Sequence, residues 1–298
     1  MIVFPDPNVE TEYKDPNGAV WDFNGTGWVR RCCEEDPVLP PADPIMDIQI
    51  IGGGGGARST KPNSYSYGGG GAGALKEYFD VDASVGSKWV FVIGAGGNDG
   101  TGGTTTLDCA ATGFSESCTG GARSTSSATE GSGGGGRGAG SGGNGGSGGP
   151  YGNNGGKGGV NASGGGGGFG SVGEDVTASG RGANGGNGYV CFDAASRAGG
   201  GGGAGASSSG RGQAGGGNGG PYEGNGYNAV DNSGSGGGGV QPSGAVAGTP
   251  GIGGSGVILI RTGLAVVSTT ADIRTTDTPE GDGRFIHMLK TSGEVVFQ

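Results

Sequence analysis

Glycine limits what this chain can fold into more than any other feature of its sequence. It supplies 83 of the 298 residues, whereas apolar side chains make up 31% and aromatic ones 7%. An ordinary layered domain needs a larger apolar content, and a helix loses about 1 kcal/mol at each glycine relative to alanine. Glycine also loses the most backbone freedom on folding. Ordered glycine segments must therefore be held by main-chain hydrogen bonds and close main-chain packing.

The glycines gather in blocks between residues 45 and 262, separated by short polar or aromatic inserts. A flexible linker is the usual fate of Gly/Ser tracts, and a collagen triple helix needs glycine at every third residue, a register that Tyr189–Ser196 breaks. The third structure is an array of extended, threefold polyglycine II helices, which pack side by side and bond to one another. We favour the array, because about 200 residues far exceeds a normal linker. Single Ala and Ser residues are expected at its rim.

Alternating, β-branched segments predict strands that enter and leave the glycine region. They are Ile45–Ile51, Tyr78–Val85, Trp89–Ile93 and Val257–Thr262, with a turn at Gly86-Ser87. Residues 263–298 add β-like segments with turns at Gly281–Gly283 and Ser292-Gly293. The predicted fold class is mainly β and irregular: a packed polyglycine II array framed by β-strands, a small N-terminal β-hairpin module, a small C-terminal β element and almost no α-helix.

Residues 1–50 differ from the rest in being acidic, rich in proline and almost free of glycine. Asn24-Gly25 favours a tight hairpin turn, and the flanking segments carry Trp21, Phe23 and Trp28. Residues 34–44 hold four prolines, which predict an extended connector. The predicted domains are residues 1–44, a hairpin attachment module with its connector; residues 45–262, the glycine-rich domain; and residues 263–298, the C-terminal β element.

The charge balance and the apolar runs exclude two classes of partner. The net charge is −10, and residues 51–262 carry eleven basic and twelve acidic residues, so the excess of Lys and Arg that nucleic acid requires is absent. The N-terminus lacks the basic start and apolar run of a secretory signal. The longest aliphatic run, Val257–Ile260, is far shorter than the roughly 20 residues of a membrane span. We expect a protein made in the cytosol, with no membrane insertion.

No arrangement of residues predicts catalysis, a cofactor or a metal site, so we do not expect an enzyme. G-x-G-x-x-G patterns arise about six times by chance in a chain so rich in glycine, and Gly156–Gly158 lacks the Ser or Thr of a P-loop. His287 is the single histidine and is expected in a strand near the surface. Cys109 and Cys118 bracket a loop. They either form a disulfide, which needs Cα atoms within about 7 Å, or stay reduced.

Eight aromatic residues lie in the inserts near or between glycine blocks. They are Tyr65, Tyr67, Tyr151, Phe169, Tyr189, Phe192, Tyr222 and Tyr227. Aromatic side chains on loops held by a rigid scaffold are common recognition elements. They are therefore candidate receptor contacts, and the alternative is that some of them cap the ends of the array.

Four glycine-rich segments resemble a known family. Ile50–Gly56, Gly68–Gly73, Val92–Gly97 and Gly253–Arg261 are similar to the glycine-rich domain of phage tail proteins, over about residues 45–262. That family carries polyglycine II-like packing and is similar to adhesins at the tips of some long tail fibres. In those adhesins, loops between glycine helices contact bacterial outer-membrane proteins or glycans. The resemblance implies the same packing and host attachment here.

The N-terminal region carries a second resemblance. Phe4–Pro7 with Tyr13, then Gly18, Trp21–Thr26 and Trp28-Val29, resembles a short module that recurs in structural proteins of marine and cyanobacterial phages. This resemblance implies that Trp21, Phe23 and Trp28 are candidates for attachment to the particle. Residues 285–297 look like a strand-turn-strand that often precedes a glycine domain, whereas here it follows one.

The expected function is that of a bacteriophage virion structural protein, a tail-fibre or adhesin type that is exposed on the particle. Residues 1–50 would contact other virion proteins of the tail or capsid, and the loops would bind a bacterial surface protein or glycan for host recognition. The alternative is a capsid decoration or head-fibre protein without a dedicated receptor. A homotrimer is compatible with this assignment, and so is an array closed within one chain.

Overall fold

The structure is a computed structural model that describes residues 12–14, 20–23, 26, 28–30, 45–58, 65–139, 141–242, 248–278 and 283–298. It divides into two compact units, Met1–Asp43 and Pro44–Gln298. In the first unit, the strands β1 (Glu12–Lys14), β2 (Val20–Phe23) and β3 (Trp28–Arg30) form an antiparallel sheet in that order. Phe23 pairs with Trp28, so both strands of the predicted hairpin are present. The predicted turn at Asn24-Gly25 and the connector 34–44 lie outside the described residues.

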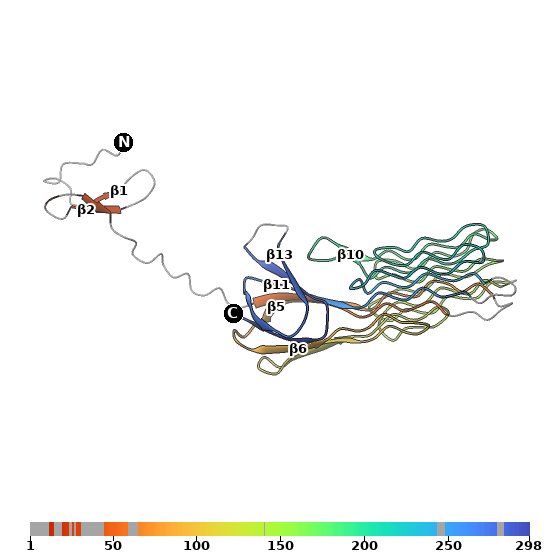
Figure 1. The fold of residues 1–298 in the computed structure, drawn as a ribbon, viewed down its shortest axis with the longest axis horizontal. Helices are drawn as coiled ribbons and strands as arrows, with labels where there is room; N and C mark the ends of the chain where they lie inside the picture. The colour runs from red at the N-terminus through yellow and green to blue at the C-terminus, as the bar shows by residue number, and fades with distance from the viewer. Residues whose placement is uncertain are drawn as a thin grey trace. The chain divides into compact units, whose positions relative to one another are not determined.

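The second unit contains two five-stranded antiparallel sheets and one short hairpin. Its strands are β4 (Ile45–Ile51), β5 (Leu75–Asp82), β6 (Lys88–Val92), β7 (Thr105–Cys109), β8 (Phe114–Cys118), β9 (Tyr189–Val190), β10 (Ser196–Arg197), β11 (Val257–Thr262), β12 (Val266–Thr269), β13 (Ile273–Asp277), β14 (Phe285–Leu289) and β15 (Gly293–Phe297). The sheet orders are β13-β14-β11-β4-β5 and β12-β15-β6-β7-β8, and β9 pairs with β10. Figure 1 labels β5, β11 and β13 of the first sheet and β6 of the second. The described chain has no helix, which confirms the predicted fold class. None of it can cross a membrane as a helix.

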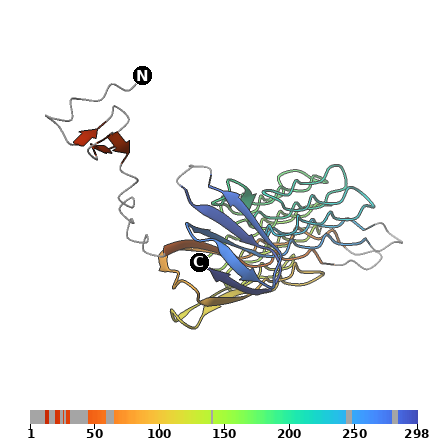
Figure 2. The ribbon, with the colours of Figure 1, turned by 60° about the vertical axis from the view of Figure 1, so that its left-hand side comes forward.

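A side-chain core lies between the two five-stranded sheets. Ile48 on β4 and Ile258 on β11 meet Trp89 and Phe91 on β6, and Phe297 on β15 completes the contact. All five side chains are at most 1% exposed. Trp89 and Phe91 come from alternate positions of β6, as expected for side chains that point to the same face of a sheet. Figure 2 shows the two sheets at one end of the unit, with the glycine-rich segments extending away from them.

The C-terminal residues 263–298 belong to both sheets. β14 lies between β13 and β11, whereas β15 lies between β12 and β6. Five residue pairs join β14 to β11 in register, from Ile258 opposite Leu289 to Thr262 opposite Phe285. The β-like segments of these residues therefore form two inner strands, β14 and β15, and two edge strands, β12 and β13. The predicted turn at residues 281–283 lies mostly outside the described residues.

The glycine-rich segments, here called rows, bond to their neighbours with a period of three residues. The amides of Gly52 and Gly55 donate to the row 71–74, those of Gly53 and Gly56 to the row 100–103, and those of Gly54 and Ala57 to the row 251–254, at 2.8–3.0 Å. Residues one turn apart thus donate hydrogen bonds to the same neighbouring row, and consecutive residues donate to different rows. This is what a threefold extended helix requires when its main-chain groups are satisfied by neighbours instead of water. The array is a polyglycine II packing.

Neighbouring rows approach too closely for side chains. A Cβ atom added to Gly54 would lie 1.9 Å from the Ser235 carbonyl oxygen, and one added to Gly166 would lie 1.9 Å from that of Gly70. Non-bonded carbon and oxygen atoms cannot approach within that distance, since van der Waals contact between heavy atoms lies near 3.5 Å. Contact distance therefore requires glycine at positions such as Gly54 and Gly166.

The expectation that Ala and Ser lie at the rim of the array is wrong. Ala72, Ser163 and Ser235 are fully buried. Ala72 packs in an apolar cluster with the side chains of β4 and β5. The Ser163 hydroxyl donates to the Tyr67 carbonyl at 2.9 Å and accepts from the Ala204 amide at 2.8 Å. A small side chain is tolerated inside because a methyl group fills a local gap or a hydroxyl group joins the main-chain network.

Cys109 and Cys118 lie at opposite ends of the β7–β8 hairpin. Cys109 pairs with Phe114, and Cys118 pairs with Thr105. Both cysteines are free and buried, so of the two alternatives they stay reduced and form no disulfide with each other. Burial raises the pKa of the Cys118 thiol to about 12, which keeps it protonated at neutral pH.

His287 is buried between the sheets, so the expectation of a surface histidine is wrong. It lies on β14, where Nε2 donates to the Leu264 carbonyl at 3.0 Å and Nδ1 accepts from the Thr275 hydroxyl at 2.9 Å. The sequence places it in an alternating strand but does not show which strand covers it. Burial lowers its pKa below the ordinary value, against a smaller opposing effect of the Leu264 carbonyl.

His287 should make the protein less stable in mild acid. Below pH 6.5 the unfolded chain binds a proton at this residue, while the folded protein, with its lowered pKa, does not. The free energy of unfolding therefore decreases as the pH is lowered. Urea unfolding at about pH 7.5 and about pH 5.5 measures the difference, with His287→Gln as the comparison, since Gln keeps hydrogen-bonding groups without titrating. The variant should lose part of this pH dependence. An equal dependence in both proteins would contradict the assignment.

Candidate functional site

One end of the array is fixed to the sheets, and the other is built from turns between rows. The rows 52–57 and 69–74 continue directly into β4 and β5 (Figure 1). At the opposite end, here called the distal end, main-chain bonds join successive turns. The Gly138 amide donates to Ser66, the Gly180 amide to Val160, and the Gly142 amide to Ala139 within one turn, at 2.8–3.0 Å. The distal end is therefore a set of short turns held by the array's own hydrogen bonds.

Three of the eight aromatic candidates pack against the sheets, away from the distal end. Phe169 and Tyr189 meet edge to face at 5.3 Å, and both contact the apolar cluster on the outer face of β4, β11 and β14, as does Phe192. The Tyr189 hydroxyl donates to Glu77 at 3.1 Å, and the Phe192 amide donates to the Gln49 side chain at 3.0 Å. Burial, followed by the Glu77 carboxylate, raises the pKa of Tyr189. These three residues therefore cap the end of the array that adjoins the sheets, which is the alternative to receptor contact.

Tyr151 is a fourth aromatic candidate near the sheets, but it is partly open to solvent. Its ring lies 4.9 Å from the Lys76 ammonium, which in turn pairs with Glu130 at 3.0 Å. The side chain is 40% exposed. A cation over an aromatic face contributes about 0.5–1 kcal/mol at an exposed site. Tyr151 therefore helps to hold Lys76 at the start of β5, and part of its ring stays accessible to solvent.

The four remaining tyrosines belong to rows and turns at or near the distal end. We call them the distal aromatic surface: Tyr65, Tyr67, Tyr222 and Tyr227. Tyr65 is 52% exposed, and Tyr222 and Tyr227 are each 59% exposed. The row 236–241 links Tyr67 and Tyr227, because Val240 bridges to Tyr67 and the Gly238 amide donates to the Tyr227 carbonyl at 2.9 Å. These two tyrosines are 160 positions apart in the sequence, from 67 to 227.

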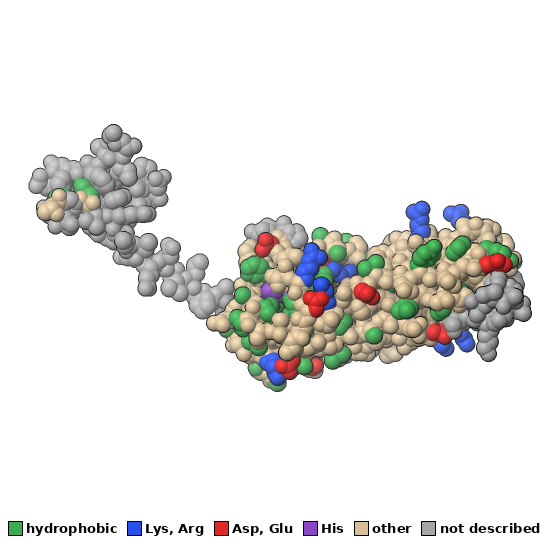
Figure 3. Space-filling view, viewed as in Figure 1, with side chains coloured by type: hydrophobic (Ala, Val, Ile, Leu, Met, Phe, Trp, Pro, Cys, Tyr) green, Lys and Arg blue, Asp and Glu red, His purple; other side chains and the backbone are tan. Residues whose placement is uncertain are grey.

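Arginine side chains support two of these tyrosines. The Arg137 guanidinium lies 5.2 Å from the Tyr65 ring centre, and that of Arg58 lies 5.5 Å from the Tyr67 ring centre. Stacking of this kind restricts the rings without burying them. Sequence reasoning did not identify either arginine, since Arg137 is 72 positions from Tyr65 and no local spacing links them. Figure 3 shows isolated charged side chains on the visible face of the array, over a surface that is mostly backbone and small residues.

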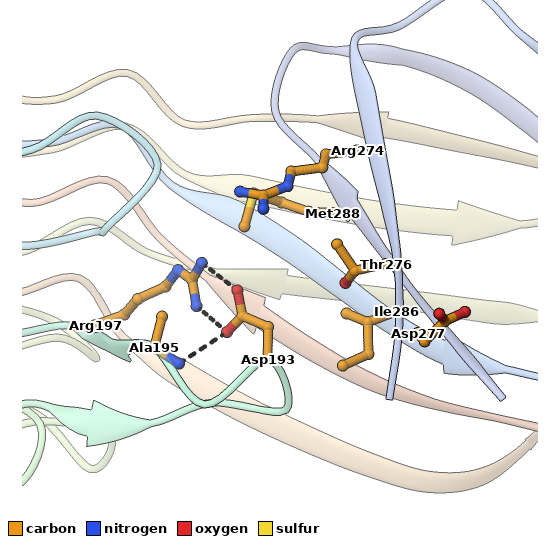
Figure 4. Close-up of a pocket in the computed structure, with 8 residues that line it drawn as sticks. All are labelled: Asp193, Ala195, Arg197, Arg274, Thr276, Asp277, Ile286 and Met288. Carbon is orange, nitrogen blue, oxygen red and sulfur yellow. Dashed lines mark hydrogen bonds and ion pairs between the residues drawn. The ribbon is translucent and has the colours of Figure 1, made fainter. Parts of the chain in front are cut away.

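A cavity of about 370 Å³ lies between the β9–β10 hairpin and the strands β13 and β14 (Figure 4). The Arg197 guanidinium donates to both Asp193 oxygens and to the Asn232 carbonyl, which leaves little of it for a ligand. Burial raises the pKa of Asp193, but hydrogen bonds and charge from Arg197 outweigh that effect and hold it below the ordinary value. This ion pair anchors the hairpin, and we assign it no recognition role.

The attachment candidates lie in the first unit. The ring centres of Phe23 and Trp28 are 5.7 Å apart, as expected for a cross-strand aromatic pair. Trp21 lies on β2 opposite Arg30, and its side chain lies outside the described residues. Among the residues that the structure describes, no three His, Cys, Asp or Glu side chains gather into a metal site.

The comparisons with known proteins concern the glycine-rich region. A family model described as a glycine-rich domain matches residues 38–263. No curated protein and no solved structure matches the chain. The matched residues make up more than half of the chain and include every row of the array together with β4 and β11, the strands that bound it. The chain therefore belongs to the glycine-rich domain family.

Proposed function

We propose that this protein is a bacteriophage virion structural protein of the tail-fibre or adhesin type, which presents its distal aromatic surface for recognition of a host bacterium. One observation carries the proposal: three tyrosines, Tyr65, Tyr222 and Tyr227, are more than half exposed, and they belong to segments that border the hydrogen-bonded rows of the array. Tyrosine supplies a large, amphipathic contact area at a low cost in conformational entropy. Exposed aromatic residues on a rigid scaffold are typical of binding surfaces and unnecessary for packing.

The array suits such a role because it holds the backbone of Tyr67 and Tyr227 in place before any partner binds. The Tyr227 carbonyl accepts from Gly238, its amide donates to Asn218, and the Tyr67 amide and carbonyl both bond to Val240. Association costs less when the contacting residues are already ordered. A surface ordered in this way favours slow dissociation from the host surface, which an adhesin requires.

The rest of the chain is assigned roles that fit this proposal. Residues 1–50 attach to other virion proteins of the tail or capsid, with Trp21, Phe23 and Trp28 as the candidate contacts. The partner at the distal end is a bacterial surface protein or glycan, and the protein acts on the outside of the particle without catalysis. The first unit has its own sheet, which is consistent with a separate attachment module.

Replacing the exposed tyrosines should abolish most binding to bacteria. A Tyr65→Ala, Tyr222→Ala, Tyr227→Ala variant should bind intact cells at least about tenfold more weakly, because aromatic contact residues often contribute 2 kcal/mol or more. Flow cytometry of the labelled full-length protein over a panel of bacterial strains measures this. Tyr151→Ala is the matched control, since Tyr151 is 40% exposed but lies near the sheets.

Two results would count against host recognition. If the wild-type protein binds no strain of the panel, the protein is better described as a capsid decoration or head-fibre protein without a receptor. If the triple variant binds as well as the wild type, the distal aromatic surface is not the contact. Thermal unfolding of each variant confirms that the array is intact.

A further inference from the structure

A second cavity, of about 560 Å³, lies on the array itself and differs from the others in its lining. It is bordered by the outer rows 174–177, 181–184 and 208–211. The side chains used below are those of Glu174, Asp175, Arg181, Asn184, Ser208 and Arg211, and the lining is predominantly polar. The cavities beside the sheets are lined by apolar and polar atoms in more equal measure. We call this cavity the polar trough.

The floor of the polar trough is fixed by hydrogen bonds between its rows. The Gly182 amide donates to the Ser208 carbonyl at 2.8 Å, and the Gly185 amide donates to the Arg211 carbonyl at 2.9 Å. The Asn184 side chain donates to Glu174 at 2.9 Å and accepts from the Arg211 amide at 2.8 Å. The trough is therefore preorganised, and a ligand would not have to order the rows on binding.

Several strong polar groups in the trough have capacity left over. Within the described part of the chain, the guanidinium groups of Arg181 and Arg211 form no hydrogen bond or ion pair. Asp175 accepts from the Lys157 amide through Oδ1, and Glu174 accepts from Asn184 through Oε2. One oxygen of each carboxylate therefore remains available. Guanidinium donors and carboxylate acceptors thus border the same cavity.

This combination selects one class of ligand. Two carboxylates and two guanidinium groups sum to zero charge, so neither a polyanion nor a polycation is favoured. A peptide would need apolar pockets for its side chains, and nucleic acid would be repelled by Glu174 and Asp175. A sugar ring carries hydroxyl groups that each donate and accept, which matches alternating donors and acceptors with little apolar area. The volume falls within the range of ligand sites, about 300–1,000 Å³.

We propose that the polar trough binds a neutral saccharide unit of a surface glycan. This proposal rests on the proposed function, because it names a ligand class and a second contact site for the same host-binding array. The guanidinium groups of Arg181 and Arg211 donate to ring hydroxyl groups, and the free oxygens of Glu174 and Asp175 accept from others. Affinity for one sugar is modest and rises when several copies of the protein bind one glycan.

The experiment uses the full-length protein and an immobilised panel of neutral oligosaccharides of glucose, galactose, mannose and N-acetylglucosamine. At least one member should be retained, and titration calorimetry then measures its affinity. The Arg181→Ala, Arg211→Ala double variant should bind that saccharide at least about tenfold more weakly, in proportion to the charge-assisted hydrogen bonds removed. Its thermal stability should be unchanged, because the array uses only the main chain of these residues. Arg274→Ala, an exposed arginine on β13, is the control.

Two results would overturn the proposal: no member of the panel is retained, or the double variant binds the retained saccharide as tightly as the wild type does. These failures differ from failure of the proposed function. If cell binding depends on the distal tyrosines while saccharide binding is absent, host recognition stands and the trough does not. If the protein binds the saccharide but no cells, the saccharide site in the trough stands and host recognition does not.

Discussion

Gly54→Ala should lower the free energy of unfolding by about 3 kcal/mol, the upper part of the range for overpacked interiors. The new methyl carbon would lie 1.9 Å from the Ser235 carbonyl oxygen. The rows must separate to admit it, and this weakens the bonds from Gly54 to Gly254 and from Gly97 to Gly54, both 2.8 Å in the native protein. Calorimetric unfolding should show a midpoint lower by roughly 6–12 °C for a unit of this size.

Gly263→Ala is the matched control for this substitution. It follows β11 directly, it is exposed, and a Cβ atom there would meet nothing within 4 Å. The same chemical change should therefore alter stability by less than about 0.5 kcal/mol. Equal destabilisation by both variants would show that glycine acts through backbone flexibility, and the argument from contact distance would be wrong.

Trp89→Ala should cost about 3–5 kcal/mol, as expected for removal of a large aromatic side chain from a packed core. Trp89 is fully buried between the sheets, its ring centre lies 5.5 Å from that of Phe114, and its indole nitrogen donates to the Ala83 carbonyl. The substitution leaves a cavity and an unpaired carbonyl group. Denaturant unfolding measures the change as a lower midpoint at nearly the same slope.

Val90→Ala tests whether this cost reflects burial. Val90 is the next residue of β6, points away from the core and is 39% exposed. Its truncation should cost less than about 1 kcal/mol, since little apolar area is returned to water. If Val90→Ala destabilised the protein as much as Trp89→Ala, the side-chain core would not lie between the sheets as described.

The glycine and tryptophan predictions concern two different kinds of interior in one unit. At closely packed glycines of the array such as Gly54, one added carbon atom destabilises the protein; between the sheets, the removal of a large ring does so. The two interiors are continuous, because Ile51 ends β4 and Gly52 begins a row. Stability therefore depends on side chains at one end of the unit and on main-chain contacts along the rest.

The strands that border the array could be predicted because their residues are β-branched and alternate. Ile45–Ile51 and Val257–Thr262 form strands with the predicted bounds. The strand predicted at Tyr78–Val85 begins three residues earlier, at Leu75, and ends at Asp82. Leu75 pairs with Ile51 across the sheet, and this pairing extends the strand toward the array. Local periodicity does not contain that information.

The strands β7 and β8 and the order of the sheets could not be predicted from the sequence. In β7 the inward residues are Thr105, Leu107 and Cys109, so only one large apolar side chain marks the alternation. The C-terminal strands insert between strands that are distant in sequence, such as β15 between β12 and β6. Such pairings depend on which edges meet in three dimensions, and composition does not determine them.

The candidate site was only partly accessible to sequence reasoning. The eight aromatic residues were recognisable, because each interrupts or borders glycine blocks. Their division into Phe169, Tyr189 and Phe192, which pack on the sheets, and the exposed tyrosines depends on which end of a row each one occupies. Because the rows differ in length, counting residues along them does not show which end of a row each aromatic residue occupies. The polar trough was missed for the same reason, since its three rows are brought together only by packing.

In this protein the main-chain bonds of the rows hold the interior together, and the connecting residues form the outer surface. Most folds assign both tasks to the same residues. At the turn Pro221–Glu223, the Gly220 amide bonds to Gly239 before the turn and the Gly226 amide bonds to Thr249 after it. Neither bond involves a side chain. The connecting residues can therefore differ in length and chemistry while the interior stays the same. One unchanging glycine framework can in this way support a large repertoire of outer shapes.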